Sequence, residues 1–192
     1  MPSKRQRPPP ERRPRQAGGI PGLGIAVWRD LDPVLRAALI YGVSLGALLY
    51  CYAKLYRTAA LNGFLELNAR ATGWLLTPFV SSVHVQSNVV QSNTYSIGIV
   101  EECTALAPLA VFIAGVLAVP ASAKSKLWGV VMGLVVLSLV NVVRMASLFF
   151  VGSRYPWAMD VAHLIVWQAL MVLLAVLLWL FWMYRWARRA PA

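Results

Sequence analysis

Charged residues are scarce in this chain of 192 residues: they make up 13% of it, and only seven are Asp or Glu. Hydrophobic residues make up 59%, more than soluble domains normally contain. This balance excludes an ordinary water-soluble domain. It leaves little of the chain for anything besides a membrane domain.

Cysteine and histidine are also scarce. Cys51 and Cys103 are the only cysteines, too few for a disulfide framework, and His84 and His163 are the only histidines. Neither pair has the spacing of a metal site, so we expect no metal ion and no cofactor. A single Cys51–Cys103 disulfide stays open as an alternative, because Cys51 lies near the end of an apolar stretch.

Long apolar runs, in contrast, are frequent. A helix needs about 20 mostly apolar residues to cross the roughly 30 Å of hydrocarbon in a bilayer. We therefore predict an all-α polytopic membrane protein with about four transmembrane helices, the second of them short. The predicted spans run from about residue 35 to 52, 103 to 119, 127 to 151 and 161 to 184.

The net charge of +11 is concentrated toward the ends of the chain. Residues 1 to 27 combine basic residues with proline and then glycine, a composition that predicts a disordered basic arm and a linker. Residues 28 to 189 form the predicted membrane domain, and residues 185 to 192 form a basic tail. This distribution argues against nucleic acid as a partner and indicates a membrane topology instead.

Counting basic residues on each side of the predicted spans orients the chain. With the N-terminus in the cytoplasm, thirteen Lys and Arg residues lie inside and four lie outside. The positive-inside rule then places both termini in the cytoplasm. Residues 57 to 102 become the one sizeable outer segment.

Two elements are predicted within this outer segment. Residues 59 to 80 mix leucines with polar residues, which favours an interfacial or re-entrant amphipathic helix. A fifth crossing is disfavoured, because it would carry Glu66 and Arg70 to mid-membrane. Residues 84 to 100 alternate apolar and polar side chains, which predicts a short β-like segment, either a small hairpin or an extended stretch that leads into the second span.

Three residues of different chemistry lie near ends of the last three predicted spans. Cys103 begins the second span, Arg144 lies about two turns, or roughly 10 Å, from the end of the third, and His163 lies in the first turn of the fourth. Since consecutive spans alternate in direction, these ends all face the outer side. An arginine inside an apolar run is costly to insert and usually marks function. We therefore expect one site near the outer face.

This combination suits nucleophilic catalysis by a thiol. A nearby cation or a helix N-terminus lowers the pKa of a cysteine, and we expect this of Cys103. His163 would carry the thiol proton, and Arg144 would hold the oxyanion of a tetrahedral intermediate. Asp160, three residues before His163, would orient the imidazole.

Each residue also has a structural interpretation that stays open. A membrane cysteine is often a small apolar packing residue, and a histidine at a span end often lies at the interface. Arg144 would in that case form an ion pair. Its partner would be Glu101, Glu102 or Asp160.

Three short motifs resemble the exosortase/archaeosortase family. They are Glu-Glu-Cys-Thr-Ala-Leu at 101–106, Asn-Val-Val-Arg at 141–144 and Ala-His at 162–163, in this order along the chain. The resemblance covers roughly residues 59 to 184 and is closer to compact members than to the longer eight-span ones. The family's cysteine is more often followed by Ser-Gly, where this chain has Thr104-Ala105.

The resemblance implies a cysteine protease or transpeptidase integral to the bacterial inner membrane, surrounded by membrane lipid. Cys103 would be the nucleophile, Arg144 the stabiliser of the intermediate and His163 the proton carrier. Asn141 would support Arg144, and Glu102 is the remaining candidate for a supporting role. The partners would be secreted proteins that end in a short motif, a hydrophobic helix and a basic tail, cut at the outer face through a thioester.

Two other functions stay open. A non-catalytic tetraspan scaffold or assembly factor for cell-surface proteins or polysaccharide would use Arg144 only as an ion-pair partner. A small transporter or channel is a weaker alternative, because the inner halves of the predicted spans carry few polar groups.

Overall fold

The computed structural model describes residues 31–56 and 58–187. The predicted arm and linker at 1–27 and the end of the basic tail, 188–192, lie outside the described residues, as does Arg57. Contacts divide the chain into two compact units, residues 1–36 and residues 37–192. The helices that pack together and the candidate site belong to the second unit.

The chain is mostly helical, and three helical stretches among the described residues are long and apolar enough to cross a membrane. They correspond to the predicted spans at 35–52, 127–151 and 161–184, with ends shifted by a few residues. The three are α2 (Pro33–Leu55), α5 (Ala123–Arg154) and the stretch Pro156–Arg185, which ends in α6 (Gln168–Arg185).

The second predicted span, at 103–119, differs from the prediction. Its helix, α4 (Leu106–Ala118), has 13 residues, fewer than the about 20 that a full crossing needs. Cys103 lies outside this helix, at the end of a separate 3-10 turn, η1 (Glu101–Cys103). The backbone of Thr104 is extended, which separates the turn from α4. A crossing by this segment stays a prediction.

Both elements predicted in the outer segment are present as local structures. The amphipathic helix is α3 (Ala59–Leu76), and it is not among the helices of membrane-spanning length and composition. A three-stranded antiparallel sheet follows it. Its strands, in spatial order, are β1 (His84–Gln86), β2 (Val89–Gln91) and β3 (Ser96–Gly98).

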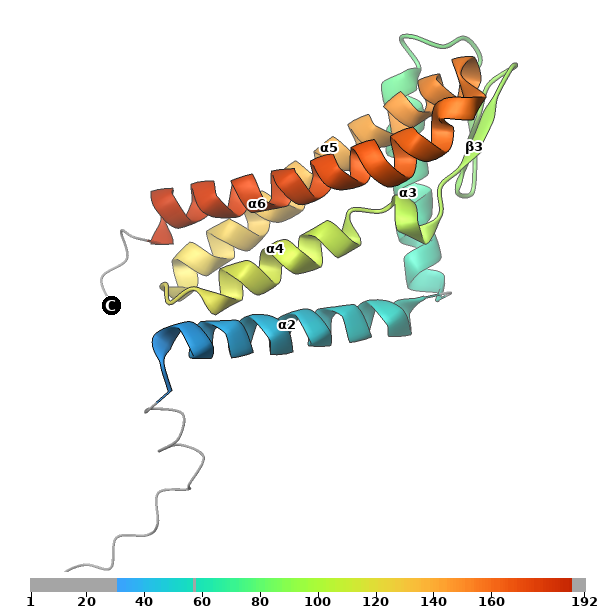
Figure 1. Ribbon diagram of the computed structural model, residues 1–192. Helices are drawn as coiled ribbons and strands as arrows, with labels where there is room; N and C mark the ends of the chain where they lie inside the picture. Colours follow the sequence, from blue (N-terminus) through green and yellow to red (C-terminus); the bar gives the residue numbers. More distant parts are fainter. Residues whose placement is uncertain (1–30, 57, 188–192) are drawn as a thin grey trace, which may run out of the picture. The chain divides into compact units, whose positions relative to one another are not determined.

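Helix α3 lies across α5 at a steep angle, and the sheet packs beside it (Figure 1). Gly73 of α3 permits the close approach of strand β1. A Cβ atom at Gly73 would lie 2.5 Å from Cγ2 of Val85. A larger residue at this position would force the Val85 side chain or its strand to shift.

Two clusters of buried apolar residues hold the helices together. One joins α3 and the sheet to the end of α5, and the other joins α4 and the middle of α5 to α6. In the second cluster, Nε1 of Trp182 donates a hydrogen bond to the carbonyl of Ser125 at 2.9 Å. Cys103 belongs to the first cluster and Ala105 to the second. The candidate site therefore lies where the two clusters meet.

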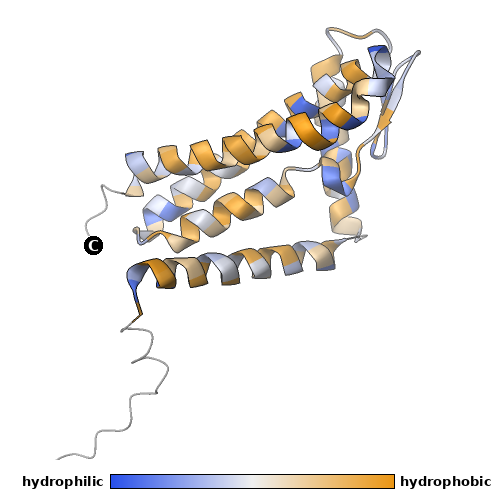
Figure 2. Ribbon diagram, in the orientation of Figure 1, coloured by the Kyte–Doolittle hydropathy of each residue, from blue (hydrophilic) through white to orange (hydrophobic). Residues whose placement is uncertain are grey.

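Apolar residues run along most of α5 and α6 (Figure 2). Many of these side chains are exposed, among them Leu139 of α5 at 63% and Leu173 of α6 at 53%. Water would penalise an exposed apolar surface of this extent, whereas the hydrocarbon of a bilayer would not. The fold is thus that of a membrane protein.

Candidate active site

Three separate segments bring a thiol, an imidazole and a guanidinium together. Cys103 ends the η1 turn, Arg144 lies on α5, and His163 lies in a π-helical segment, η3 (Val161–Trp167), that precedes α6. The Sγ atom of Cys103 is 3.5 Å from Nε2 of His163, within hydrogen-bonding reach of a sulfur atom. The fold therefore places the thiol and the imidazole in direct contact.

Arg144 is buried beside this pair, with only 1% of its surface exposed. Its Nε atom has no hydrogen-bond partner among the described residues. Within residues 31–56 and 58–187, Arg144 forms no salt bridge, so the ion pair with Glu101, Glu102 or Asp160 is not present. Burying a guanidinium without a counter-ion is costly, which makes this residue a strong indication of function.

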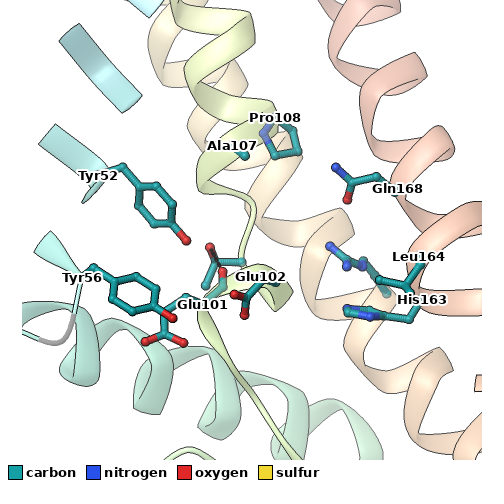
Figure 3. A pocket seen from close by; sticks show the side chains of 11 residues that line it. Tyr52, Tyr56, Glu101, Glu102, Ala107, Pro108, His163, Leu164 and Gln168 are labelled. Atoms are coloured by element: carbon teal, nitrogen blue, oxygen red, sulfur yellow. Dashed lines mark hydrogen bonds between the residues drawn. The ribbon is translucent and has the colours of Figure 1, made fainter. Parts of the chain in front are cut away.

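A cavity of about 410 Å³ opens beside these groups (Figure 3). Arg144 and His163 line it, together with Gln168 of α6. Cys103 is not itself part of the lining, but its neighbours Glu102 and Thr104 are. The volume lies within the range of pockets that hold small ligands or short peptide segments. A substrate in this cavity would thus lie next to the thiol.

Burial raises the pKa of the Cys103 thiol above its ordinary value. A backbone hydrogen bond with Val100 and the positive charge of Arg144 oppose this rise in pKa, and the carboxylate of Glu102 adds to it. The lowering that we expected from a cation and a helix N-terminus is outweighed, because the thiol is buried and α4 begins only at Leu106. A raised pKa favours the protonated thiol, so a nucleophilic role would require a base to remove its proton.

Asp160 does not take the position expected of an orienting residue. It is exposed, and it makes no hydrogen bond to His163 in the part of the chain that the structure describes. The two residues are three apart, which places them on one face of an α-helix. From Val161 onward the helix is π-helical, with hydrogen bonds that span five residues instead of four. Asp160 and His163 therefore do not keep the spacing that they would have on one face of an α-helix. Such π-helical turns are frequent at functional sites.

Asn141 is fully buried one turn before Arg144 on α5. Its Nδ2 donates to Oδ1 of Asn68 on α3 at 3.3 Å, and Nδ2 of Asn68 donates to the carbonyl of Phe64 at 2.8 Å. Thr72, one turn further along α3, is buried as well. We had not predicted Asn68 and Thr72, because polar residues of an amphipathic helix are expected on its solvent face. Asn141 thus ties α5 to α3 close to Arg144.

The cavity contains further residues to which the sequence assigned no role in the site. Tyr52 lies in the last turn of α2, Tyr56 directly follows that helix, and Gln168 is the first residue of α6. For Gln168 a signal existed, since it and His163 are the polar interruptions of the last apolar run. Two tyrosines at the end of a span carry no such signal, because they are common at membrane interfaces.

Both cysteines are free. Cys51 is exposed and Cys103 is buried, so the alternative of a Cys51–Cys103 disulfide is wrong. No group of three or more His, Cys, Asp and Glu side chains that could hold a metal ion occurs among the described residues. The Cys103 thiol is therefore not committed to a covalent bond.

No protein-family model, curated protein or solved structure matches this chain, so the family resemblance of its three motifs rests on the sequence alone.

Proposed function

We propose that this protein is an exosortase-like membrane cysteine protease or transpeptidase. It would cleave the C-terminal sorting signal of exported proteins through a thioester intermediate. The observation that carries the proposal is the 3.5 Å contact between Cys103 Sγ and His163 Nε2, beside the buried Arg144. Packing alone does not explain why a thiol, an imidazole and a buried guanidinium meet beside one cavity. Nor does it explain why this guanidinium forms no salt bridge among the described residues.

Cleavage would begin with a proton transfer. The neutral thiol of Cys103 gives its proton to Nε2 of His163, and the sulfur attacks the carbonyl carbon of the scissile peptide bond. Negative charge develops on the carbonyl oxygen, and the guanidinium of Arg144 stabilises it from the cavity wall. The C–N bond then breaks, and His163 gives the proton to the leaving amine. The product is an acyl-cysteine thioester.

A second nucleophile would resolve this thioester. An amine, a hydroxyl or water attacks the same carbonyl carbon and gives a proton to His163. The new C–N or C–O bond forms, the C–S bond breaks, and the proton passes from His163 to the Cys103 sulfur. Asn141 supports these steps by holding α5 against α3, one turn from Arg144.

In the proposed membrane arrangement the chain crosses a bacterial inner membrane four times, with both termini in the cytoplasm and the cavity at the outer face. The distribution of Lys and Arg along the sequence supports this orientation. Helix α4, with 13 residues, would cover about 20 Å, so the bilayer would thin locally around it. A peptide bond just outside the anchor helix of a substrate would then reach the cavity.

Substitution of the nucleophile tests the proposal. Cys103→Ala and Cys103→Ser are expected to insert and fold normally but to stop cleavage of an exported protein that ends in a short motif, a hydrophobic helix and a basic tail. The readout is the change in gel mobility of such a protein co-expressed with each variant. Cys51→Ala is the matched control and is expected to retain processing, since Cys51 is exposed and lies outside the cavity lining. Normal processing by Cys103→Ala would end the proposal.

A further inference from the structure

The cavity beside Arg144 and His163 has a wall that the proposed reaction does not use. Glu101 and Glu102 of the η1 turn lie on this wall. The rings of Tyr52 and Tyr56 extend toward the two carboxylates from the end of α2 (Figure 3). We call these four residues the acidic wall.

The charge of the acidic wall comes from the carboxylates of Glu101 and Glu102. No Lys, Arg or His of residues 31–56 and 58–187 forms a salt bridge with Glu101 or Glu102. Carboxylates bind ammonium and guanidinium groups through charge-assisted hydrogen bonds, and tyrosine rings attract the same cations through their π faces. The acidic wall therefore has the chemistry of a site for an organic cation.

A second feature of the cavity points to a bound ligand independently. Arg144 lines the same cavity, is almost fully buried, and has an Nε atom without a hydrogen-bond partner among the described residues. A buried guanidinium of this kind is suited to a carbonyl or anionic oxygen. The lining of the cavity thus carries groups of both charges, suited to an oxygen and a cation that bind close together.

We infer that the cavity binds an ammonium or guanidinium group at the acidic wall, beside an acyl group whose oxygen Arg144 holds. The identity of the ligand rests on the proposed function. In that reaction the cation would lie close to the carbonyl group that is cleaved or transferred. Two sources have this chemistry. One is a Lys or Arg side chain of the substrate beside the scissile bond, and the other is the amine of an acceptor.

A reporter thiol measures the charge of the cavity without using the proposed catalytic groups. Ala107 is exposed and lines the cavity, so Ala107→Cys in a chain that also carries Cys51→Ala and Cys103→Ala offers a single thiol there. Two methanethiosulfonate reagents are compared, one with a trimethylammonium-ethyl group and one with a sulfonatoethyl group. Each forms a mixed disulfide with the thiolate and releases methanesulfinate. The ratio of the two rates reports the local charge, because the fraction of thiolate cancels.

Removing either carboxylate is expected to lower the cation-to-anion rate ratio about threefold or more. This is the effect expected when a solvated unit charge several ångströms from the reporter thiol is lost. The variants are Glu101→Gln and Glu102→Gln, and the effect is expected to shrink in about 1 M salt. Glu66→Gln is the matched control, because Glu66 pairs with Arg70 at 2.6 Å and lies outside the cavity lining. A ratio that neither cavity substitution changes, or that Glu66→Gln changes as much, overturns the inference.

Protection of the reporter identifies the source of the cation. The probes are acetyl-Ala-Lys-Ala-amide, acetyl-Ala-Gln-Ala-amide and n-butylamine, each competing with the neutral reagent methyl methanethiosulfonate. Protection by the lysine peptide alone assigns the cation to a substrate side chain, and equal protection by n-butylamine assigns it to a free amine. Equal protection by the glutamine peptide, or protection by no cation, overturns the inference. Because the reporter chain lacks Cys103, these results are independent of the cleavage test.

Discussion

The Sγ atom of Cys103 lies 3.5 Å from Nε2 of His163, although 60 positions separate the two residues in the chain. The contact joins the η1 turn to the π-helical segment where the two buried clusters meet. At this distance the imidazole can accept the thiol proton without an intervening water. The buried thiol needs such an acceptor, because its pKa is raised.

Replacement of the imidazole is expected to remove the base. His163→Ala should lower the rate of substrate processing by roughly 10²- to 10⁴-fold, the usual contribution of a positioned acid–base group. The rate is measured as the appearance of cleaved substrate over time. His84→Ala is the control, because His84 is exposed on β1 and should leave the rate unchanged. A wild-type rate in His163→Ala would assign His163 to packing.

Thiol reactivity is expected to depend on pH in a defined direction. Since burial raises the pKa of Cys103, its alkylation by N-ethylmaleimide in a Cys51→Ala chain should have a midpoint above the about 8.5 of a free thiol such as glutathione. Glu102→Gln should move this midpoint down, and Arg144→Gln should move it up, because their charges act on the Cys103 pKa in opposite directions. A midpoint at or below that of glutathione contradicts the burial argument.

The same shift in pKa makes stability depend on pH. Above about pH 8.5 the unfolded chain has already lost the thiol proton, whereas the folded chain still binds it. Stability must therefore fall as the pH rises from this value toward the raised pKa of Cys103. We expect the unfolding temperature of the wild type in detergent to decrease more between pH 7 and pH 9.5 than that of Cys103→Ala. Equal decreases would show that the thiol makes no contribution.

Replacing Arg144 by lysine distinguishes a catalytic role of this residue from a role in a non-catalytic scaffold. Arg144→Lys keeps the charge but loses the planar fork of donors, so processing should fall by about 10²- to 10³-fold. If Arg144 served only in a structural ion pair, Lys could replace it with almost no effect. That outcome is expected of a non-catalytic scaffold. Arg154→Lys is the matched control at the exposed end of α5 and should process substrate normally. Membrane insertion of both variants is checked by fractionation.

The buried asparagine pair is expected to stabilise the contact between α3 and α5. Asn68→Ala leaves Nδ2 of Asn141 without its acceptor, at a cost of about 1–3 kcal/mol for an unsatisfied buried donor. The unfolding temperature in detergent should fall accordingly. Asn62→Ala removes an exposed asparagine from the same helix and should have little effect. Equal shifts in the two variants would show that the Asn68–Asn141 bond does not stabilise the fold.

Close packing of α5 against α6 depends on a glycine. A Cβ atom at Gly129 would lie 2.6 Å from Nε1 of Trp182, so Gly129→Ala should destabilise the protein by about 1–3 kcal/mol through overpacking. At Gly46 a Cβ would meet no atom within 4 Å, and Gly46→Ala should be neutral or slightly stabilising. The comparison is made by thermal unfolding in detergent. Equal stability of the two variants would contradict the packing.

The helices were predicted to different degrees, and the reason is physical. Apolar runs located α2, α5 and the stretch that ends in α6, because the length and composition of a membrane helix are local properties of the sequence. The run at 103–119 has the same apolar character, yet its helix starts only at Leu106. The extended backbone of Thr104 interrupts the run, and the one local sign of a later helix start is Pro108, which lies in the first turn of α4. The π-helical winding around His163 had no local signal of this kind.

The sequence by itself determined the helical membrane class and the order in which a cysteine, an arginine and a histidine follow one another, because composition and spacing are enough for both. Tertiary structure alone decided how these groups meet. The contact of Cys103 with His163, the absence of a salt bridge at Arg144 among the described residues and the cavity beside them depend on distances between residues far apart in the chain. It also reversed the expected direction of the Cys103 pKa, because loss of water on burial outweighs the charge of a neighbouring cation.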